Sequence, residues 1–243
     1  MNVVYIAGYG RSGSTILEKL FSKKLSALSL GESYYFYNSI EDKNKSIKCS
    51  CGKKNYECDF WKHFNNCKSK NLFFKTIYDY AKQNNFKTIT DSSKTTRKRI
   101  LYPLKYRNAS FNLYIVVIKR RIEHVINSRI NFQKRNKKKY NRIFIVLTTL
   151  INFIITHFLT YIIYKLFYSS TPYKTVKYED LEDFDLIDLF SESLNNEKNK
   201  NTIHMIGGNR IRFNNDLHIS VQKEKQFPSK NLIYNLIDSL NGY

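Results

Sequence analysis

The sequence predicts an α/β fold in which a parallel sheet carries helices on both faces. The chain opens on an apolar run, Val3–Ala7, that is typical of a buried strand, and a helical Ile-Leu-x-x-Leu-Phe pattern follows at Ile16–Phe21. Strand-like and helix-like segments then alternate to the end of the chain. With 243 residues and 42% apolar content, the chain is long enough for one sizeable domain, which we expect to span residues 1–243.

The later elements follow the same alternation. Short β-branched or apolar runs predict strands at 87–90, 111–118 and 173–177, and the second of these is the most apolar. Apolar residues at helical spacing predict helices near 72–83, 123–132 and 185–194, with a helix or loop over 97–106 and a long apolar helix over about 142–168. In parallel sheets ligands bind beyond the carboxyl ends of the strands, and most polar motifs of this chain fall there.

A glycine-rich turn separates the first strand from the first helix. From Gly8 to Thr15 it has the spacing of a nucleotide P-loop, except that Ser14 stands where the lysine belongs. A helix that starts at such a turn directs N–H groups and its positive dipole end at one place, which is an anion site. The missing lysine would reach the β- and γ-phosphates of a triphosphate. With Arg11 as its cation, the loop therefore predicts a nucleotide that carries one transferable group beyond its 5′-phosphate.

Further motifs follow the other predicted strands, and each has a second interpretation. Lys94, in Asp91-Ser92-Ser93-Lys94, is expected in the same crevice as Arg11, or it is a solvated lysine in a turn. Arg120 ends the most apolar strand, with Ser128 on the next helix, and suits phosphate binding or a solvated strand end. The Tyr178 ring suits stacking on a base or a place in the core. His204–Phe213, taken alone, predicts a basic surface loop.

Taken in order, these motifs resemble the P-loop sulfotransferases that use 3′-phosphoadenosine 5′-phosphosulfate (PAPS). Arg11–Thr15 resembles the family's 5′-phosphosulfate loop, Arg120 and Ser128 its 3′-phosphate motif, and Tyr178-Glu179-Asp180-Leu181 the motif whose ring lies near the adenine. A bacterial group of the family is more similar still, since it shares Gly31-Glu32, Cys49-Ser50-Cys51-Gly52, Phe60-Trp61, Asp91–Lys94, the Gly208–Arg212 loop and the terminal Gly242-Tyr243. One departure is Arg120-Arg121-Ile122-Glu123, where the family has Arg-Asp-Pro-Arg. Arg212 or Arg121 would then take the role of the second arginine.

The resemblance implies an enzyme that moves the sulfuryl group of PAPS in line to a hydroxyl or amine acceptor. A carbohydrate, a lipid or a tyrosine would accept it, PAP would be the product, and no metal would be required. The implied catalytic residues are Glu32 as base, with Lys94 and Arg11 neutralising charge. Glu32 also suits a helix-capping or acceptor-binding carboxylate. The implied cofactor-binding residues are Gly10, Arg11, Ser12, Gly13, Ser14, Thr15, Arg120, Ser128, Tyr178 and Arg212.

Two other functions compete with this one. A P-loop kinase or NTPase is disfavoured by Ser14 and by the lack of an obvious carboxylate pair for Mg²⁺. A non-catalytic protein that binds a membrane surface is suggested by the basic run Lys134–Lys139 ahead of the long apolar helix. The formal charge of +21 reflects both a general lysine bias and a field for anionic ligands. No nucleic-acid-binding motif accompanies the charge, so no nucleic acid partner is expected.

The apolar helix is expected in the protein core, with peripheral membrane contact and a transmembrane span as alternatives. Asn152 and His157 interrupt its middle, where polar groups are costly in lipid. A span would also place Tyr178 across the bilayer from the anion loop. No secretory signal precedes the first strand, which predicts a cytoplasmic protein, either free or membrane-associated.

The cysteines cluster in a segment that is expected to be an insertion, at about 41–70. Cys49, Cys51, Cys58 and Cys67 lack the Cys-x-x-Cys pairs of common zinc sites, so reduced thiols are favoured over zinc and no metal ligands are assigned.

Overall fold

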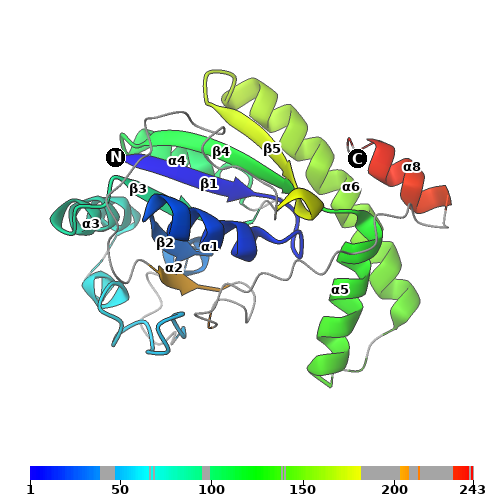
Figure 1. Ribbon diagram of the computed structural model, residues 1–243, viewed down its shortest axis with the longest axis horizontal. Coiled ribbons are helices and arrows are strands. Elements are labelled where there is room, and N and C mark those ends of the chain that lie inside the picture. Colours follow the sequence, from blue (N-terminus) through cyan, green and yellow to red (C-terminus); the bar gives the residue numbers. More distant parts are fainter. Residues whose placement is uncertain are drawn as a thin grey trace.

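A six-stranded parallel sheet organises the computed structural model, with strand order β5-β4-β1-β3-β2-β6 (Figure 1). The structure describes residues 1–38, 47–65, 67, 69–94, 99–137, 139, 141–181, 203–207, 213, 232–240 and 242. The strands are β1 (Asn2–Ala7), β2 (Leu28–Gly31), β3 (Thr88–Asp91), β4 (Asn112–Lys119), β5 (Tyr173–Lys177) and β6 (Ile203–Ile206). The α-helices are α1 (Ser14–Leu25), α2 (Tyr34–Asn38), α3 (Lys70–Gln83), α4 (Tyr102–Asn108), α5 (Ile122–Arg135), α6 (Arg142–Phe167) and α8 (Leu232–Leu240), and the 3₁₀ turns are η1 (Trp61–Phe64) and η2 (Tyr178–Asp180).

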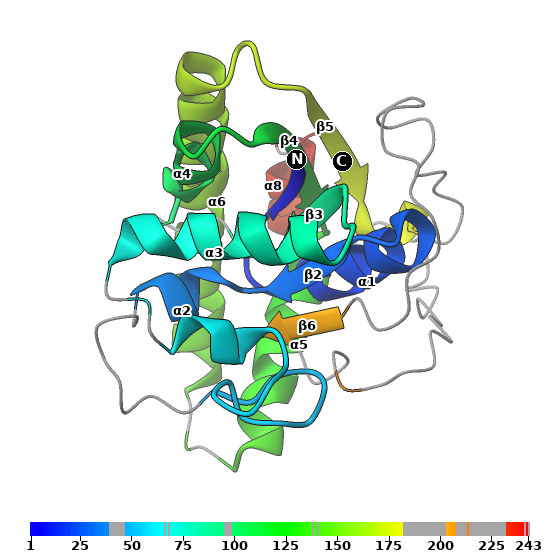
Figure 2. The ribbon, with the colours of Figure 1, turned by 90° about the vertical axis from the view of Figure 1, so that its left-hand side faces the viewer.

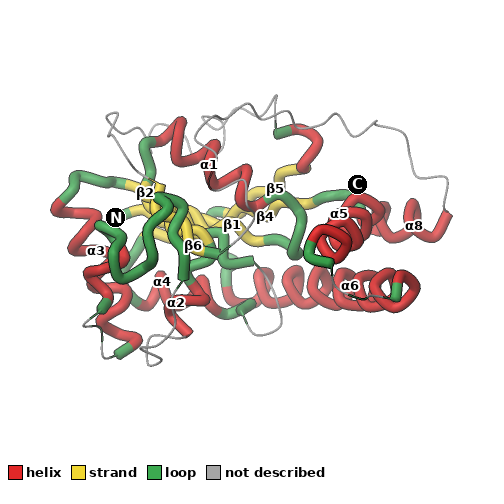
Figure 3. Tube along the Cα trace, turned by 90° about the horizontal axis from the view of Figure 1, so that it is seen from below, coloured by secondary structure: helices red, strands yellow, loops and turns green. Residues whose placement is uncertain are grey.

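Helices cover both faces of the sheet, as the alternation of the sequence predicts. Helix α1 lies on one face, and α2, α3, α4 and part of α6 lie on the other (Figure 3). The side chains of β1 alternate between these layers, as they must in a strand. Val4 and Ile6 pack with α1, whereas Val3 and Tyr5 pack with the cluster that includes α3 and α4. The predicted fold class is confirmed.

Four short elements were not predicted, and the prediction of a surface loop at His204 was wrong. Strands β2 and β6 and helix α2 have no strong periodic signal in the sequence. Helix α8 does have one, because apolar residues recur at helical spacing over Leu232–Leu240, and the sequence analysis did not use it. His204 was expected to begin a surface loop, but it lies in β6, which pairs in parallel with β2 and is buried at His204 and Met205 (Figure 2). Pairing with a neighbouring strand, which local sequence does not reveal, makes this segment a strand. The helix expected near 185–194 lies outside the described residues.

Helix α6 is not the core helix that the sequence favoured. It buries one stripe, which consists of Ile145, Thr149, Phe153, Thr156, Thr160 and Tyr164. The large apolar side chains that it exposes are Ile143, Phe144, Leu147, Ile151, Ile154, Phe158, Tyr161, Leu166 and Phe167. Among the helices of the described residues, α6 alone is long and apolar enough to cross a membrane by length and composition. This differs from an ordinary surface helix, because three threonines share the buried stripe with three apolar or aromatic residues while most of the large apolar residues face outward.

Both ends of α6 nevertheless belong to the same domain. Near its start, Ile145 and Phe153 pack with α5, and near its end Tyr164 joins the cluster under the sheet. The following strand, β5, pairs with β4. A helix held in this way lies along the domain, so the fold does not place Tyr178 and the glycine-rich loop after β1 on opposite sides of a bilayer.

A buried carboxyl group, Glu18, connects α1 to the centre of the sheet. Its side chain is fully buried, and Oε1 accepts hydrogen bonds from the Gly31 amide at 2.8 Å and from Thr90 Oγ1 at 3.3 Å. Burial raises the pKa of Glu18 from 4.5 to about 8, because the charged form loses its hydration. Near neutral pH this carboxyl group is therefore protonated in the folded protein.

We expect Glu18 to make the folded state less stable as pH rises. Between about pH 4.5 and about pH 8 the folded state keeps the Glu18 proton that the unfolded state releases, so the free energy of unfolding falls across this window. In Glu18→Gln the free energy of unfolding should decrease less over this pH range than in wild type, by on the order of 2–4 kcal/mol. Urea unfolding at several pH values measures this difference. Glu57→Gln, at an exposed carboxylate, is the control and should keep the wild-type pH dependence. Equal pH dependence in wild type and Glu18→Gln would contradict this prediction.

Candidate active site

The loop between β1 and α1 packs its backbone against an aromatic ring. Arg11 and Gly13 both have positive φ, at 78° and 100°. A Cβ atom added at Gly13 would lie 2.6 Å from Tyr178 Cε2, so only glycine allows this approach. Ile16 and Leu17 donate their amides to the Gly13 carbonyl at 2.9 and 3.1 Å, which starts α1 directly after the loop. The sequence thus places a helix N-terminus at the carboxyl end of β1.

This N-terminus opens on a cavity of about 260 Å³. The cavity is lined by Gly10, Arg11, Gly13, Ser14, Thr15, Ile16, Lys94, Arg120, Ser128 and Tyr178. The structure therefore brings together the loop, the end of β3, the end of β4, helix α5 and the end of β5. Of the residues predicted to bind the cofactor, Ser12 is buried and does not line this cavity. Arg212 lies outside the described residues, as do the rest of the Gly208–Arg212 loop and Tyr243.

Arg120 connects three of these segments. Its Nη1 donates a hydrogen bond to the Arg11 carbonyl at 2.9 Å, and its guanidinium lies 4.1 Å from the centre of the Tyr178 ring. A cation over an aromatic face is attracted by the ring quadrupole, which favours this orientation. Arg120 is thereby held at the wall that the loop, β4 and β5 share.

A second cavity adjoins the first along α5, and the sequence analysis did not identify it. Arg120 and Ser128 line both cavities, and the second is completed by His124, Asn127, Asn131, Lys134 and Arg135. These helix positions recur every three or four residues, so they form one polar face of α5. That spacing was a usable signal in the sequence. The sequence analysis instead took Lys134 and Arg135 as part of a basic run ahead of the long apolar helix.

The charge of the two cavities is positive. In the part of the chain that the structure describes, neither cavity is lined by an aspartate or a glutamate. Burial and the nearby Arg135 lower the pKa of Arg11, whose guanidinium lies 4.2 Å from the Phe132 ring. Cations that are crowded in this way, next to a helix N-terminus, favour an anion with more than one charged group.

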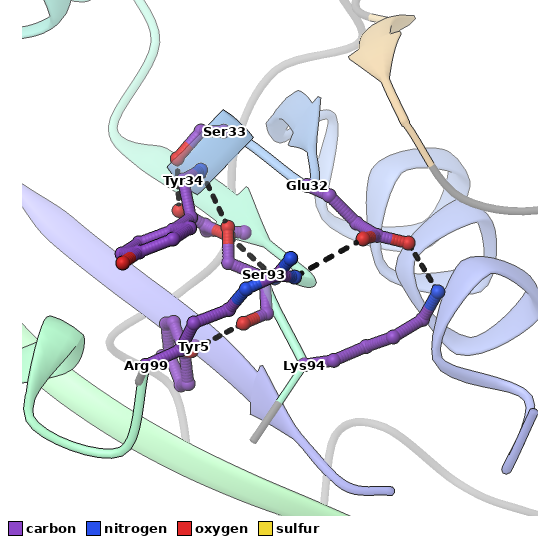
Figure 4. Close-up of polar contacts among 8 residues, drawn as sticks. Tyr5, Glu32, Ser33, Tyr34, Ser93, Lys94 and Arg99 are labelled. Atoms are coloured by element: carbon purple, nitrogen blue, oxygen red, sulfur yellow. Dashed lines mark hydrogen bonds and ion pairs between the residues drawn. The ribbon is translucent and has the colours of Figure 1, made fainter. Parts of the chain in front are cut away.

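The carboxylate of Glu32 lies at the end of β2, between two cations (Figure 4). The Glu32 side chain is 2% exposed and forms ion pairs with Lys94 and, at 3.3 Å, with Arg99. Arg99 in turn lies over the rings of Tyr35 and Tyr34, at 4.3 and 4.9 Å from their centres. Arg99, which lies in the segment expected to be a helix or loop, was not among the predicted site residues. Since Lys94 also lines the first cavity, it connects that cavity to Glu32.

A buried hydrogen-bond network fixes the turn that carries Lys94. Asp91 accepts hydrogen bonds from Tyr106 Oη at 2.6 Å, from the Ser93 amide at 2.7 Å and from Ser33 Oγ. The Ser93 carbonyl accepts from Tyr5 Oη at 2.8 Å. Burial raises the pKa of Asp91, and the hydrogen bonds to its carboxylate oppose that shift. The β3 turn is thus held from both of its neighbouring strands, which sets the direction of Lys94.

Comparison with known proteins places this arrangement in a known fold. No protein-family profile matches the sequence, and no curated protein matches it. A solved structure, the sulfotransferase domain from the curacin biosynthetic pathway, matches with a TM-score of 0.57 and 17% sequence identity over 100% of this chain and 98% of that chain. The chain has the fold of a sulfotransferase domain over its whole length.

Proposed function

We propose that this protein is a PAPS-dependent sulfotransferase. The observation that carries the proposal is the pair of adjoining basic cavities, because Arg120 and Ser128 line both of them. A nucleotide with phosphates at its 5′ and 3′ positions presents two anionic groups a short distance apart. The 5′-phosphosulfate would lie at the N-terminus of α1, and the 3′-phosphate would lie beside Arg120 and Ser128. The Tyr178 ring would form the wall beside the nucleoside.

The charges of the site favour this donor over ATP. Transfer from a triphosphate requires Mg²⁺, which takes oxygen ligands such as carboxylates. Among the described residues, no carboxylate lines either cavity, and Ser14 replaces the lysine that would reach the outer phosphates. The site offers cations instead, in Arg11, Lys94 and Arg120. A sulfuryl group carries less charge than a phosphoryl group, so these cations suffice without a metal.

Transfer would proceed in line. The acceptor oxygen or nitrogen forms a bond to sulfur while the bond between sulfur and the bridging oxygen of the 5′-phosphate breaks. The electron pair of the broken bond stays on the phosphate oxygen of PAP, where Lys94 and Arg11 would balance the negative charge that develops. The acceptor proton passes to the Glu32 carboxylate. Such loose anionic transition states are stabilised mainly by positioning and by fixed charges, both of which the held β3 turn supplies.

The acceptor would enter on the Glu32 side of Lys94. Lys94 lines the proposed donor cavity and also forms an ion pair with Glu32, so its ammonium group would lie next to both the donor and the base. Arg99, Tyr34 and Tyr35 surround Glu32 on its other side. We propose that these residues form the start of the acceptor path.

Calorimetry with nucleotides tests the donor assignment. PAP should bind far more tightly than AMP, because Arg120 and Ser128 bind its 3′-phosphate, and ATP with Mg²⁺ should bind weakly. Arg120→Ala should weaken PAP binding by about 2–4 kcal/mol, as expected when a charge-assisted pair is lost, and should change AMP binding much less. Arg142→Ala, at an exposed arginine outside both cavities, is the matched control and should bind PAP like wild type. Equal affinities for PAP and AMP would refute the assignment.

Turnover by Glu32 variants tests the chemical step, after a screen with labelled PAPS against sugars, phenols and lipids has identified an acceptor. Glu32→Gln should leave PAP binding nearly unchanged and lower kcat by ~10²-fold or more, because the acceptor proton loses its base. An acceptor with a more acidic proton should partly rescue Glu32→Gln but should give Lys94→Ala little rescue. Glu57→Gln is the control. Near-wild-type turnover of Glu32→Gln would place the base elsewhere.

We further propose that the exposed face of α6 binds the surface of an anionic lipid bilayer. The face is broad and apolar, and no Asp or Glu occurs in α6. Lys137 and Lys139, which precede α6, and Arg142, its first residue, are exposed where they would meet anionic headgroups. Apolar area beside basic residues is the pattern of helices that lie in the membrane interface.

Sedimentation with vesicles tests this second proposal. The protein should pellet with phosphatidylglycerol vesicles more than with phosphatidylcholine vesicles, and Phe158→Glu should weaken that binding by about tenfold or more. Leu72→Glu, at an exposed apolar residue of α3, is the control and should bind like wild type. Carbonate should release the bound protein. Failure to pellet with either vesicle, or a dimer that Phe158→Glu dissociates, would assign the face to another occupant.

A further inference from the structure

Three cysteines and a histidine meet at the edge of the sheet, away from the proposed donor site. Cys49, Cys51, Cys58 and His204 each offer one ligand atom, and all four atoms lie within 4.8 Å of one another. Cys67, which the sequence analysis grouped with the other cysteines, lies elsewhere, with Sγ 3.3 Å from Thr76 Oγ1. His204 is 146 residues from Cys58 in the chain, so local spacing could not reveal the fourth member.

The distances within the cluster match those around a tetrahedral ion. Cys58 Sγ lies 3.5 Å from Cys49 Sγ and 3.4 Å from His204 Nδ1. With zinc–sulfur bonds of about 2.3 Å and zinc–nitrogen bonds of about 2.0–2.1 Å, tetrahedral angles separate two sulfurs by about 3.8 Å and a sulfur from a nitrogen by about 3.6 Å. The four atoms therefore need to move only slightly to surround one ion.

Backbone hydrogen bonds from separate parts of the chain hold the ligands in place. Cys49 pairs with Ile206 of β6 in an antiparallel bridge, and the Ser50 amide donates to the Met205 carbonyl at 2.9 Å. Trp61 Nε1 donates to the carbonyl of His204 at 2.6 Å. Cys49, Cys58 and His204 are buried, and only Cys51 is exposed. Such a framework fixes the ligand positions before any ion binds.

We propose that Cys49, Cys51, Cys58 and His204 bind one Zn²⁺ in a closed structural site. Three thiolates and one imidazole fill the four positions of tetrahedral zinc and leave no place for substrate or a catalytic water. Soft sulfur ligands also disfavour Mg²⁺ and Ca²⁺, which take oxygen. This proposal stands on the geometry of the cluster and does not depend on the proposed transfer activity.

The ion would fasten the cysteine-containing segment to the edge strand of the sheet. The segment contributes three ligands, and β6 contributes His204. β6 borders the proposed acceptor side, since the Glu32 amide donates to the Ile206 carbonyl at 2.6 Å. A cross-link between residues so far apart in sequence removes much conformational freedom from the unfolded chain. Loss of zinc should therefore destabilise the protein and loosen the strand that supports Glu32.

Elemental analysis and cobalt substitution of the full-length protein test the site. Protein purified under reducing conditions should contain about one zinc per chain, as a closed four-ligand site predicts. Co²⁺ in its place should show tetrahedral d–d bands and a thiolate-to-metal charge-transfer band. Cys51→Ser removes the exposed ligand with little effect on packing, and should lower zinc affinity by more than the ~10–100-fold typical of losing an outer-shell partner. His204→Ala should behave likewise if it folds.

Cys67→Ser is the matched control, since it removes a cysteine outside the cluster. It should keep zinc, the cobalt spectrum and the loss of thermal stability that a chelator causes in wild type, whereas Cys51→Ser should show little response to the chelator. Protein that neither contains nor takes up zinc would overturn the proposal, as would equal metal loss in Cys67→Ser and Cys51→Ser. A disulfide between Cys49 and Cys58 in protein purified without reductant, with no zinc, would also overturn it.

Discussion

All the paired strands of the sheet run in the same direction, and the arrangement of the site depends on this constraint. Their carboxyl ends meet at one edge, so the residues that follow β1, β2, β3, β4 and β5 become neighbours although the sequence separates them widely. The glycine-rich loop follows β1, Glu32 follows β2, Lys94 follows β3, Arg120 follows β4 and Tyr178 follows β5. Each of these five strands thus contributes one part of a site that no single segment contains.

Bringing the carboxyl ends of the strands together does not by itself orient the charged side chains that follow them. Buried polar groups orient these side chains. Asp91 holds the turn before Lys94, and Glu18 joins the amide of Gly31 to α1, one residue ahead of Glu32. Buried polar groups that are hydrogen-bonded to several segments hold those segments in one arrangement, and removing such a partner is costly. The same residues therefore stabilise the fold and position the cation and the carboxylate that transfer would need.

Much of this arrangement could be predicted from the sequence, because long apolar strands and a glycine-rich turn leave clear local signals. Strands β1, β4 and β5, the loop, Arg120, Ser128 and Tyr178 were all identified in this way. What was missed depends on contacts between distant segments. Strand β6 forms by pairing with β2, and His204 comes close to the cysteines only in the folded chain. Arg99 lies beside Glu32, but no local sequence motif marks it as a partner of that residue. The outward apolar face of α6 was missed because composition shows that a helix is apolar but not which side is buried.

The most direct test of the account is the structure of the protein with PAP bound. If the two adjoining cavities accept the two phosphates of one nucleotide, electron density for the 5′-phosphate should lie at the amides of Gly13–Thr15 and density for the 3′-phosphate beside Arg120 and Ser128. Lys94 should lie between the 5′-phosphate and Glu32. A nucleotide that leaves Arg120 and Ser128 without a phosphate contact, or that binds away from the loop, would contradict it.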